Sequence, residues 1–156
     1  MYNEILMEHN RHPRHKGEIA GARRIYTLKN ESCGDEITVF FKMRQGKIVD
    51  GSWTGKGCAI AQASADLMMG ALIGTELADS MFWTMMIDTL LMKGKVPKEF
   101  REEVGDLQAM GEVARMPARV KCAETPWQGA VYLARDERVQ PSERVVKLLG
   151  LPPMPW

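Results

Sequence analysis

The chain has 156 residues, with 21 Lys and Arg against 20 Asp and Glu, and a formal net charge of +1. This length favours one domain with a core of its own. The charges form no block of one sign, which argues against a nucleic-acid groove or an anionic membrane surface. We therefore expect protein partners or small groups, no nucleic acid and no membrane.

The first residues do not have the pattern of an export signal. Residues 1–4 contain no basic region followed by an apolar run, and no segment approaches about 18 consecutive apolar residues. The chain has three cysteines, an odd number, whereas exported proteins usually pair an even number. We expect a cytoplasmic protein whose thiols are available as metal ligands or nucleophiles.

The first expected element is a short helix that begins near Tyr2 and ends before a polar run containing Pro13. All histidines of the chain lie in this N-terminal segment, and they are His9, His12 and His15. We place them in a basic loop that offers no carboxylate. We therefore expect contacts with solvent or a partner there, and no second metal site.

Between residues 22 and 54 the apolar pattern changes to the alternation that is typical of strands. Residues 25–29 alternate, and two further runs at 37–41 and 47–50 are separated by a turn at Gln45 and Gly46. The pattern predicts three antiparallel strands, of which the last two form a hairpin.

The remainder of the chain favours helix. Small and straight-chain residues predict a helix that starts near Cys58, a second helix should span 76–93, and Pro117 suits the first turn of a third. Pro126 should kink or end that third helix, because proline cannot donate the helical hydrogen bond. We expect an α+β fold, with a small three-stranded antiparallel sheet packed against several helices.

Two later segments are more polar or irregular. Residues 96–115 are predicted to form a short helical insertion. The chain end contains a small amphipathic piece at 145–149 and then a Pro-rich stretch, which we expect to be mobile.

Three widely spaced cysteines and one nearby carboxylate favour a metal or sulfur-handling site over a disulfide framework. Gly34 separates Cys33 from Asp35, and its backbone freedom would let both side chains turn toward one point. Cys58 follows two glycines at the start of a predicted helix, where the thiolate is favoured. With Cys122 the set would provide three sulfurs and one oxygen, which suits zinc or, with a changed ligand set, an iron–sulfur centre.

Two basic residues accompany the last cysteine. Arg119 lies three residues before Cys122, hence on the same face of the predicted helix, and Lys121 is adjacent to it. Their charge would stabilise a site that holds several thiolates and a carboxylate. An ordinary solvated basic face is the alternative explanation, and it applies to Lys121 more than to Arg119.

Four segments, in this order, resemble the IscU/NifU-N/SufU family of iron–sulfur cluster assembly proteins over about the first 135 residues. The first segment includes His9 and the run Pro-Arg-His-Lys-Gly, the second is Cys-Gly-Asp, the third surrounds Cys58, and the fourth surrounds Cys122. They occupy residues 2–17, 33–35, 55–64 and 117–123.

The resemblance implies a domain at residues 1–135, including the insertion at about 96–115, and a separate tail at 136–156. It further implies a zinc ion held by Cys33, Asp35, Cys58 and Cys122. The family's function is to accept sulfur from a cysteine desulfurase, a pyridoxal-phosphate enzyme that would here be SufS-like. Cys33 matches the thiol that receives the persulfide sulfur, after a desulfurase histidine has replaced it on the metal.

Two features favour the SufU branch of this family. Scaffold-type IscU proteins have a histidine where this chain has Lys121, and they have a shorter connection before the last cysteine. The favoured interpretation is a zinc-dependent sulfur acceptor, or sulfurtransferase, in iron–sulfur cluster biogenesis. One alternative is a scaffold on which a transient [2Fe–2S] cluster is built with the same residues and passed to other assembly proteins. Another is an adaptor whose zinc is structural.

Overall fold

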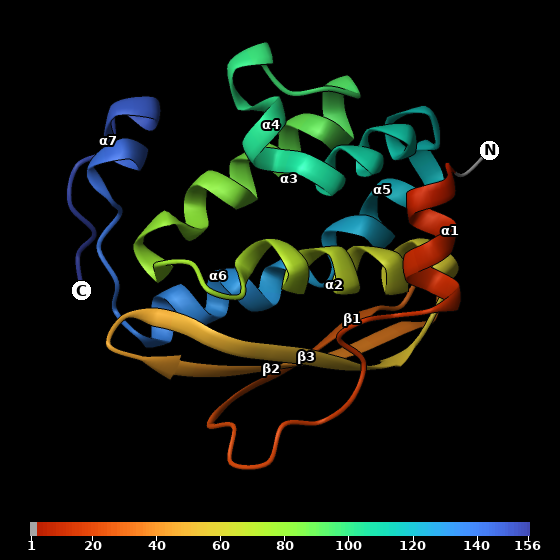
Figure 1. Cartoon of the computed structure of the whole chain (residues 1–156), viewed down its shortest axis with the longest axis horizontal. Helices are drawn as coiled ribbons and strands as arrows, with labels where there is room; N and C mark the ends of the chain where they lie inside the picture. The colour runs from red at the N-terminus through yellow and green to blue at the C-terminus, as the bar shows by residue number, and fades with distance from the viewer. Residues whose placement is uncertain (1–2) are drawn as a thin grey trace.

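A computed structural model of the chain describes residues 3–156, so the predicted place of Tyr2 on the first helix lies outside the described residues. The strands form one layer, and the helices are stacked above it (Figure 1). This is the α+β fold that the sequence predicts. The elements are α1 (Glu4–Arg11), β1 (Arg24–Asn30), β2 (Asp35–Arg44), β3 (Lys47–Lys56), α2 (Ala59–Leu72), η1 (Leu77–Asp79), α3 (Ser80–Lys93), η2 (Lys98–Phe100), α4 (Arg101–Val104), η3 (Gly105–Arg115), α5 (Pro117–Glu124), α6 (Trp127–Asp136) and α7 (Glu143–Leu149), where η marks a 3₁₀ helix.

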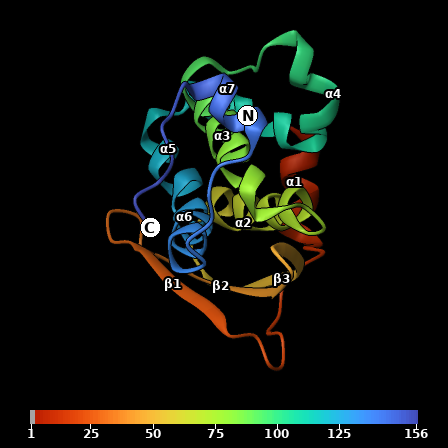
Figure 2. The same ribbon diagram turned by 90° about the vertical axis from the view of Figure 1, so that its left-hand side faces the viewer.

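The sheet is an antiparallel meander in the order β1-β2-β3, with the helices on one side of it (Figure 2). Ile37, Val39 and Phe41 alternate along β2 and are fully buried. Val39 lies against Gly129 of α6, where a methyl group in place of the glycine hydrogen would collide with the valine side chain. The three predicted strands are therefore confirmed, and so is the turn between β2 and β3.

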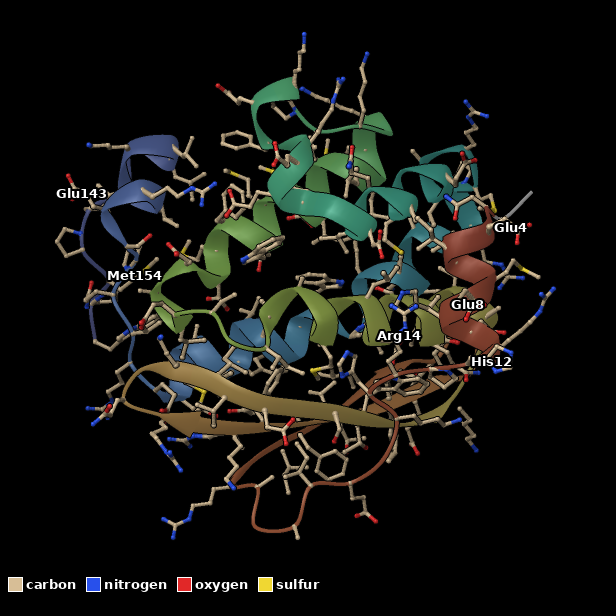
Figure 3. All side chains as sticks on the ribbon, viewed as in Figure 1. Glu4, Glu8, His12, Arg14, Glu143 and Met154 are labelled. Atoms are coloured by element: carbon tan, nitrogen blue, oxygen red, sulfur yellow. The ribbon has the colours of Figure 1, made fainter. Side chains whose placement is uncertain are left out.

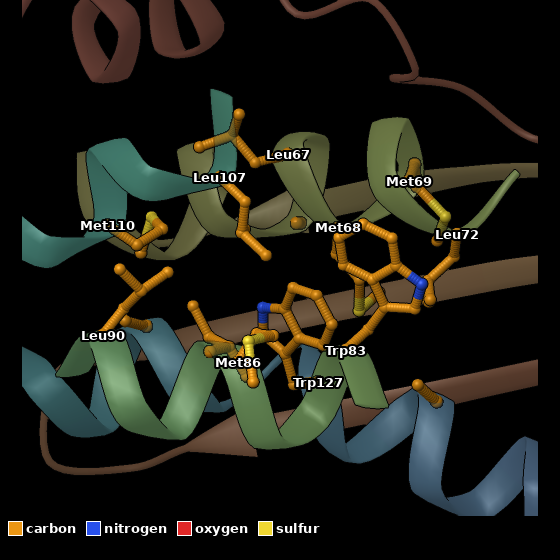
Figure 4. Packing of buried hydrophobic residues seen from close by; sticks show 14 of the residues in the cluster. Leu67, Met68, Met69, Leu72, Trp83, Met86, Leu90, Leu107, Met110 and Trp127 are labelled. Atoms are coloured by element: carbon orange, nitrogen blue, oxygen red, sulfur yellow. The ribbon is translucent and has the colours of Figure 1, made fainter. Parts of the chain in front are cut away.

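Helix α2 is the central helix of the molecule. Most of its residues are small or unbranched, and ten of its 14 residues are buried. It packs against β2 and β3 on one side and against α3 on the other. Met68 and Met69 are fully buried and Met86 of α3 is nearly so. Figure 4 shows Leu107 and Met110 of η3 in the same group of buried side chains as Met68 and Met86, whereas Met69 lies apart from η3, near Leu72.

The predicted helices are present, with one difference of detail. The helix expected at 76–93 begins with the 3₁₀ turn η1 and continues as α3, and Gly94 ends it in the left-handed conformation. The helix that begins at Pro117 ends at Glu124, which confirms the early end predicted near Pro126, and a further helix, α6, begins just after that proline. The segment 96–115 contains η2, α4 and η3. Within residues 3–156, no helix combines the length and hydropathy needed to cross a membrane.

The prediction that the N-terminal histidines contact solvent or a partner is wrong for His9. His9 is 5% exposed, and its Nδ1 lies 2.6 Å from Oδ2 of Asp66 on α2. Asp66 is fully buried and also accepts hydrogen bonds from Trp53 Nε1 and from the main-chain N–H groups of Arg14 and His15. His9 thus lies on α1 rather than in a loop, and Asp66 of α2 supplies the carboxylate that fixes the N-terminal segment to the core.

The C-terminal tail folds back along α3 and α6, at the opposite end of the molecule from Glu4 and Glu8 of α1 (Figure 3). The Arg144 guanidinium of α7 lies 3.7 Å from the centre of the Phe82 ring and forms an ion pair with Glu103. Beyond α7 the chain has no regular secondary structure. The side chain of Gln140 nevertheless forms hydrogen bonds with main-chain atoms of Met154 and Trp156.

Candidate metal centre

The turn between β1 and β2 carries the first candidate donors. Asn30 and Asp35 are paired across the two strands, so that only four residues connect them. The Cys33 N–H donates to the Asn30 carbonyl at 3.3 Å, and Gly34 has a φ of +71°, which side chains larger than hydrogen disfavour. The turn leaves Cys33 half-buried, whereas Asp35 at the start of β2 is 2% exposed.

The second cysteine lies where β3 passes into α2. Cys58 is the N-cap residue of α2, and its Sγ accepts a hydrogen bond from the Ala61 N–H at 3.4 Å. Its own N–H donates to Asp35 Oδ1 at 2.9 Å. The preceding Gly57 has a φ of +154°, and a Cβ at this position would collide with the Asp35 carboxylate. Only a glycine lets the chain approach Asp35 this closely.

The third cysteine is on α5 and is fully buried. The Sγ atoms of Cys33 and Cys122 and a carboxylate oxygen of Asp35 all lie within 4.8 Å of one another. Two sulfur ligands at about 2.3 Å from one zinc ion lie at most about 4.6 Å apart, so small shifts would let these donors share an ion. Within residues 3–156 they form the one group of three or more close His, Cys, Asp or Glu donors.

The structure therefore brings Cys33, Asp35 and Cys122 together and leaves the Cys58 sulfur outside that group. Cys58 is still a neighbour of the group. Burial raises the pKa of Cys122, and contacts with Cys33, Asp35 and Cys58 raise it further. A metal ion would have to displace the proton of this buried thiol.

The two basic residues predicted beside the site differ in position. Arg119 Nη1 donates to Cys33 Sγ across 3.8 Å. Lys121 is exposed and forms no ion pair among residues 3–156. The positive charge nearest the thiols thus comes from Arg119.

One residue at the site is absent from the sequence prediction. Asn30 is 2% exposed, and its Nδ2 lies 3.1 Å from Asp35 Oδ2 and 3.5 Å from Cys122 Sγ. Asparagine at the end of a strand is unremarkable as a sequence feature. Its proximity to Asp35 would have followed only from the exact register of the β1–β2 hairpin.

The residues present fit a zinc ion. Thiolate sulfurs and a carboxylate oxygen are donors that zinc accepts. The main chain at Gly57 lies so close to the Asp35 carboxylate that a Cβ there would collide with it. Cys33, Asp35 and Cys122 would bind first, and Cys58 could complete four-coordination if its sulfur turned away from Ala61.

Comparison with known proteins places the fold among iron–sulfur assembly proteins. The NifU-like N-terminal domain family matches residues 1–123. The zinc-dependent sulfurtransferase SufU of Bacillus subtilis (strain 168) is 30% identical over 130 residues, which is 82% of this chain and 85% of that protein. The scaffold protein IscU of Thermotoga maritima is 33% identical over 129 residues, 82% of this chain and 88% of that protein.

Solved structures agree with this assignment. The crystal structure of a SUF-system scaffold protein from Fervidobacterium islandicum AW-1 superposes with a TM-score of 0.75 at 32% identity, covering 84% of this chain and 94% of that one. The N-terminal part of a NifU-like protein from Brucella abortus superposes with a TM-score of 0.76 at 22% identity, covering 88% and 95%. The second likeness concerns the fold alone.

Proposed function

The chain belongs to the NifU-like N-terminal domain family, and we propose that it is a zinc-dependent sulfur acceptor in iron–sulfur cluster assembly. The sulfur donor would be the persulfide of a pyridoxal-phosphate cysteine desulfurase of the SufS type. The SufU relative is named a zinc-dependent sulfurtransferase, which supports this assignment. The three unpaired cysteines suit a cytoplasmic protein whose thiols stay reduced.

The proposal rests on the different burial and contacts of the candidate donors. Cys33 is half-buried on a four-residue turn, and its thiol contacts Arg119. Asp35 and Cys122 are buried and held by strand β2 and helix α5. Among the three donors that lie together, Cys33 is therefore the one that can leave the site with the smallest change in the rest of the fold. Cys58 is also half-buried, but its sulfur caps α2.

In this function Cys33 would undergo a thiol–persulfide exchange. Its thiolate attacks the outer sulfur of the desulfurase persulfide, a new S–S bond forms on Cys33, and the S–S bond of the donor breaks. The electron pair of the broken bond leaves with the donor cysteine as a thiolate. A zinc ion, when bound, keeps its thiol ligands deprotonated and also suppresses their reactivity until they leave it.

Arg119 would assist this exchange through its charge. The Arg119 guanidinium lies beside the Cys33 sulfur, where its positive charge is close to the reacting atoms. The same charge would stabilise the anionic persulfide after transfer. Lys121, which is exposed, is then available to contact the desulfurase.

A scaffold for a [2Fe–2S] cluster is the second candidate. The IscU relatives are named as cluster assembly scaffolds, at identities similar to that of SufU, and the same donors would serve. Metal analysis and a visible spectrum of the untreated protein separate the two functions. The proposal requires zinc in a colourless protein that accepts sulfur from a desulfurase, whereas a scaffold requires a coloured cluster that is transferable after anaerobic reconstitution.

A further inference from the structure

We propose that Asn30 is a positioning residue of this metal centre. Its side-chain amide would hold the Asp35 carboxylate and the Cys122 thiolate, which come from distant parts of the chain, in place for a thiophilic divalent cation such as zinc. This inference rests on the metal site of the proposed function. It does not depend on whether sulfur is transferred.

The contacts of the amide are specific. Asn30 Nδ2 lies 3.1 Å from Asp35 Oδ2 and 3.5 Å from Cys122 Sγ. An amide nitrogen carries two N–H groups, so both contacts can be made at once. Asn30 and Cys122 are separated by 92 residues. The amide thus joins the β1–β2 hairpin to helix α5 at the point where their candidate ligands meet.

The Asp35 carboxylate is held at both of its oxygens. Asn30 binds Oδ2, and the N–H of Cys58 binds Oδ1. Residues that bind metals commonly receive hydrogen bonds from a surrounding set of groups, and these groups orient the ligands and tune the affinity. Asn30 contributes such bonds to two ligands at once.

The other atom of the same amide argues against a role in packing alone. Asn30 Oδ1 is buried and has no hydrogen-bond partner among residues 3–156. Such an orphaned acceptor is unfavourable for folding. The amide nevertheless directs its nitrogen toward Asp35 and Cys122, because both of these neighbours accept hydrogen bonds.

Cys33 receives no comparable support. Its thiol contacts the partly exposed Arg119 at 3.8 Å, and Asn30 reaches it only through the main-chain bond of the turn. Asn30 therefore fixes the Asp35–Cys122 side of the centre and leaves the Cys33 side free to open. Its loss should weaken metal binding without removing the thiol that accepts sulfur.

The test measures metal binding by two variants of Asn30. Asn30→Asp keeps the shape of the side chain but replaces the donor with an anionic oxygen, and Asn30→Ser keeps one short donor. Ser52→Ala is the matched control, since Ser52 Oγ is the other buried orphan atom among residues 3–156 and lies on β3 opposite Phe40. Zinc affinity is measured by competition with a chelator, and the cobalt(II) form is compared by absorption spectroscopy.

We expect Asn30→Asp to bind zinc at least about 10-fold more weakly than the unchanged protein, and its sulfur-to-cobalt bands to shift. Asn30→Ser should show a smaller loss, and Ser52→Ala should bind zinc normally. Unchanged zinc affinity in both Asn30 variants would overturn the inference. So would normal cobalt spectra combined with a lower melting temperature of the metal-free variants, which is the result expected of a purely structural residue.

The outcomes also separate this inference from the proposed function. If Asn30→Asp fails to fold, Asn30→Ser decides by the same criteria. A protein that binds zinc through Asn30-dependent ligands but accepts no sulfur would refute the proposed function alone. A protein that accepts sulfur and binds zinc equally well without Asn30 would refute the inference alone.

Discussion

The main-chain N–H of Cys58 donates a 2.9 Å hydrogen bond to Oδ1 of Asp35. The start of α2 is thereby joined to the start of β2. This bond fixes the main chain of Cys58 relative to the Asp35 carboxylate. Gly57, which directly precedes Cys58, makes this approach possible, because a Cβ at this position would collide with the Asp35 carboxylate. The geometry of the metal centre thus depends on main-chain atoms as well as on the donors.

Replacing this glycine should damage the centre specifically. In Gly57→Ala the new methyl group would push Asp35 away from Cys58, so we expect a lower stability and at least about a 10-fold loss of zinc affinity. Gly21→Ala is the control, because Gly21 also has a positive φ but no atom lies within 4 Å of its Cβ position. That control should lose only the backbone cost of about 1–2 kcal/mol. Equal zinc affinity in the two variants would contradict the account.

Removing the proposed acceptor thiol should abolish sulfur transfer and spare the fold. In Cys33→Ser the half-buried turn can accommodate a hydroxyl, so we expect a melting temperature of the metal-free protein close to that of the unchanged protein. Persulfide formation and stimulation of the desulfurase should be lost. Ser32→Ala, in the same turn, should keep both. If Cys33→Ser retained fold, metal and stimulation alike, the adaptor alternative would be correct.

The Asp35 carboxylate is predicted to be a ligand and a structural acceptor at once. Asp35→Ala should reduce zinc retention during dialysis against a chelator. It should also lower the free energy of unfolding of the metal-free protein by about 1–3 kcal/mol, because the Asn30 amide and the Cys58 N–H lose their acceptor. Asp50→Asn, at an exposed position of β3, is the control. Unchanged metal content in Asp35→Ala would remove Asp35 from the ligand set.

Asp66 should contribute to the pH dependence of stability. Burial alone raises the pKa of Asp66, but hydrogen bonds from Trp53, His9 and the N–H groups of Arg14 and His15 outweigh burial and hold the pKa below its ordinary value of 3.8. A carboxyl with a lowered pKa stabilises the fold above the pKa of the unfolded chain, and this contribution is lost as the pH falls through the folded pKa.

Asp66→Asn tests this directly in the metal-free protein. We expect the variant to be less stable than the unchanged protein at neutral pH, and the difference to shrink as the pH falls below about 4. Urea unfolding at a series of pH values measures it, with the exposed Asp106→Asn as the control. A difference that stays constant across this range would show that Asp66 acts through shape rather than charge.

The tail should be held by Arg144. Arg144 stacks on Phe82 and pairs with Glu103 through both carboxylate oxygens, and lysine cannot reproduce this planar, two-pronged contact. Arg144→Lys should therefore increase the rate of proteolysis within residues 137–156 and change the melting temperature of the domain little. Lys147→Arg, on an exposed side of α7, should leave proteolysis unchanged. Equal cleavage of both variants would show that other contacts hold the tail.

Most of the fold follows from patterns within short segments. Alternation predicts β2 and β3, and a proline in sequence predicts where α5 ends, because each depends on neighbouring residues. The Cys-Gly-Asp run likewise identifies two donors that a single turn brings together. Such local signals account for the sheet, the helices and the candidate ligands.

The parts that the sequence does not predict depend on contacts between distant residues. His9 meets Asp66 across 57 residues, and Asn30 meets Cys122 across 92. Neither Asn30 nor Asp66 has a local pattern that sets it apart from an ordinary polar residue. The direction of the Cys58 side chain is a different case, because its thiol makes a local contact with the Ala61 N–H at the start of α2.

The central claim is that Cys33 accepts sulfur, and peptide mass spectrometry tests it most directly. The zinc-loaded protein is incubated with a pyridoxal-phosphate cysteine desulfurase and cysteine, and each cysteine-containing peptide is then examined. The account predicts one added sulfur atom on the Cys33 peptide, none in Cys33→Ser, and faster sulfide release by the desulfurase. No added sulfur on Cys33 and no stimulation, in a protein that takes up a transferable [2Fe–2S] cluster, would contradict it.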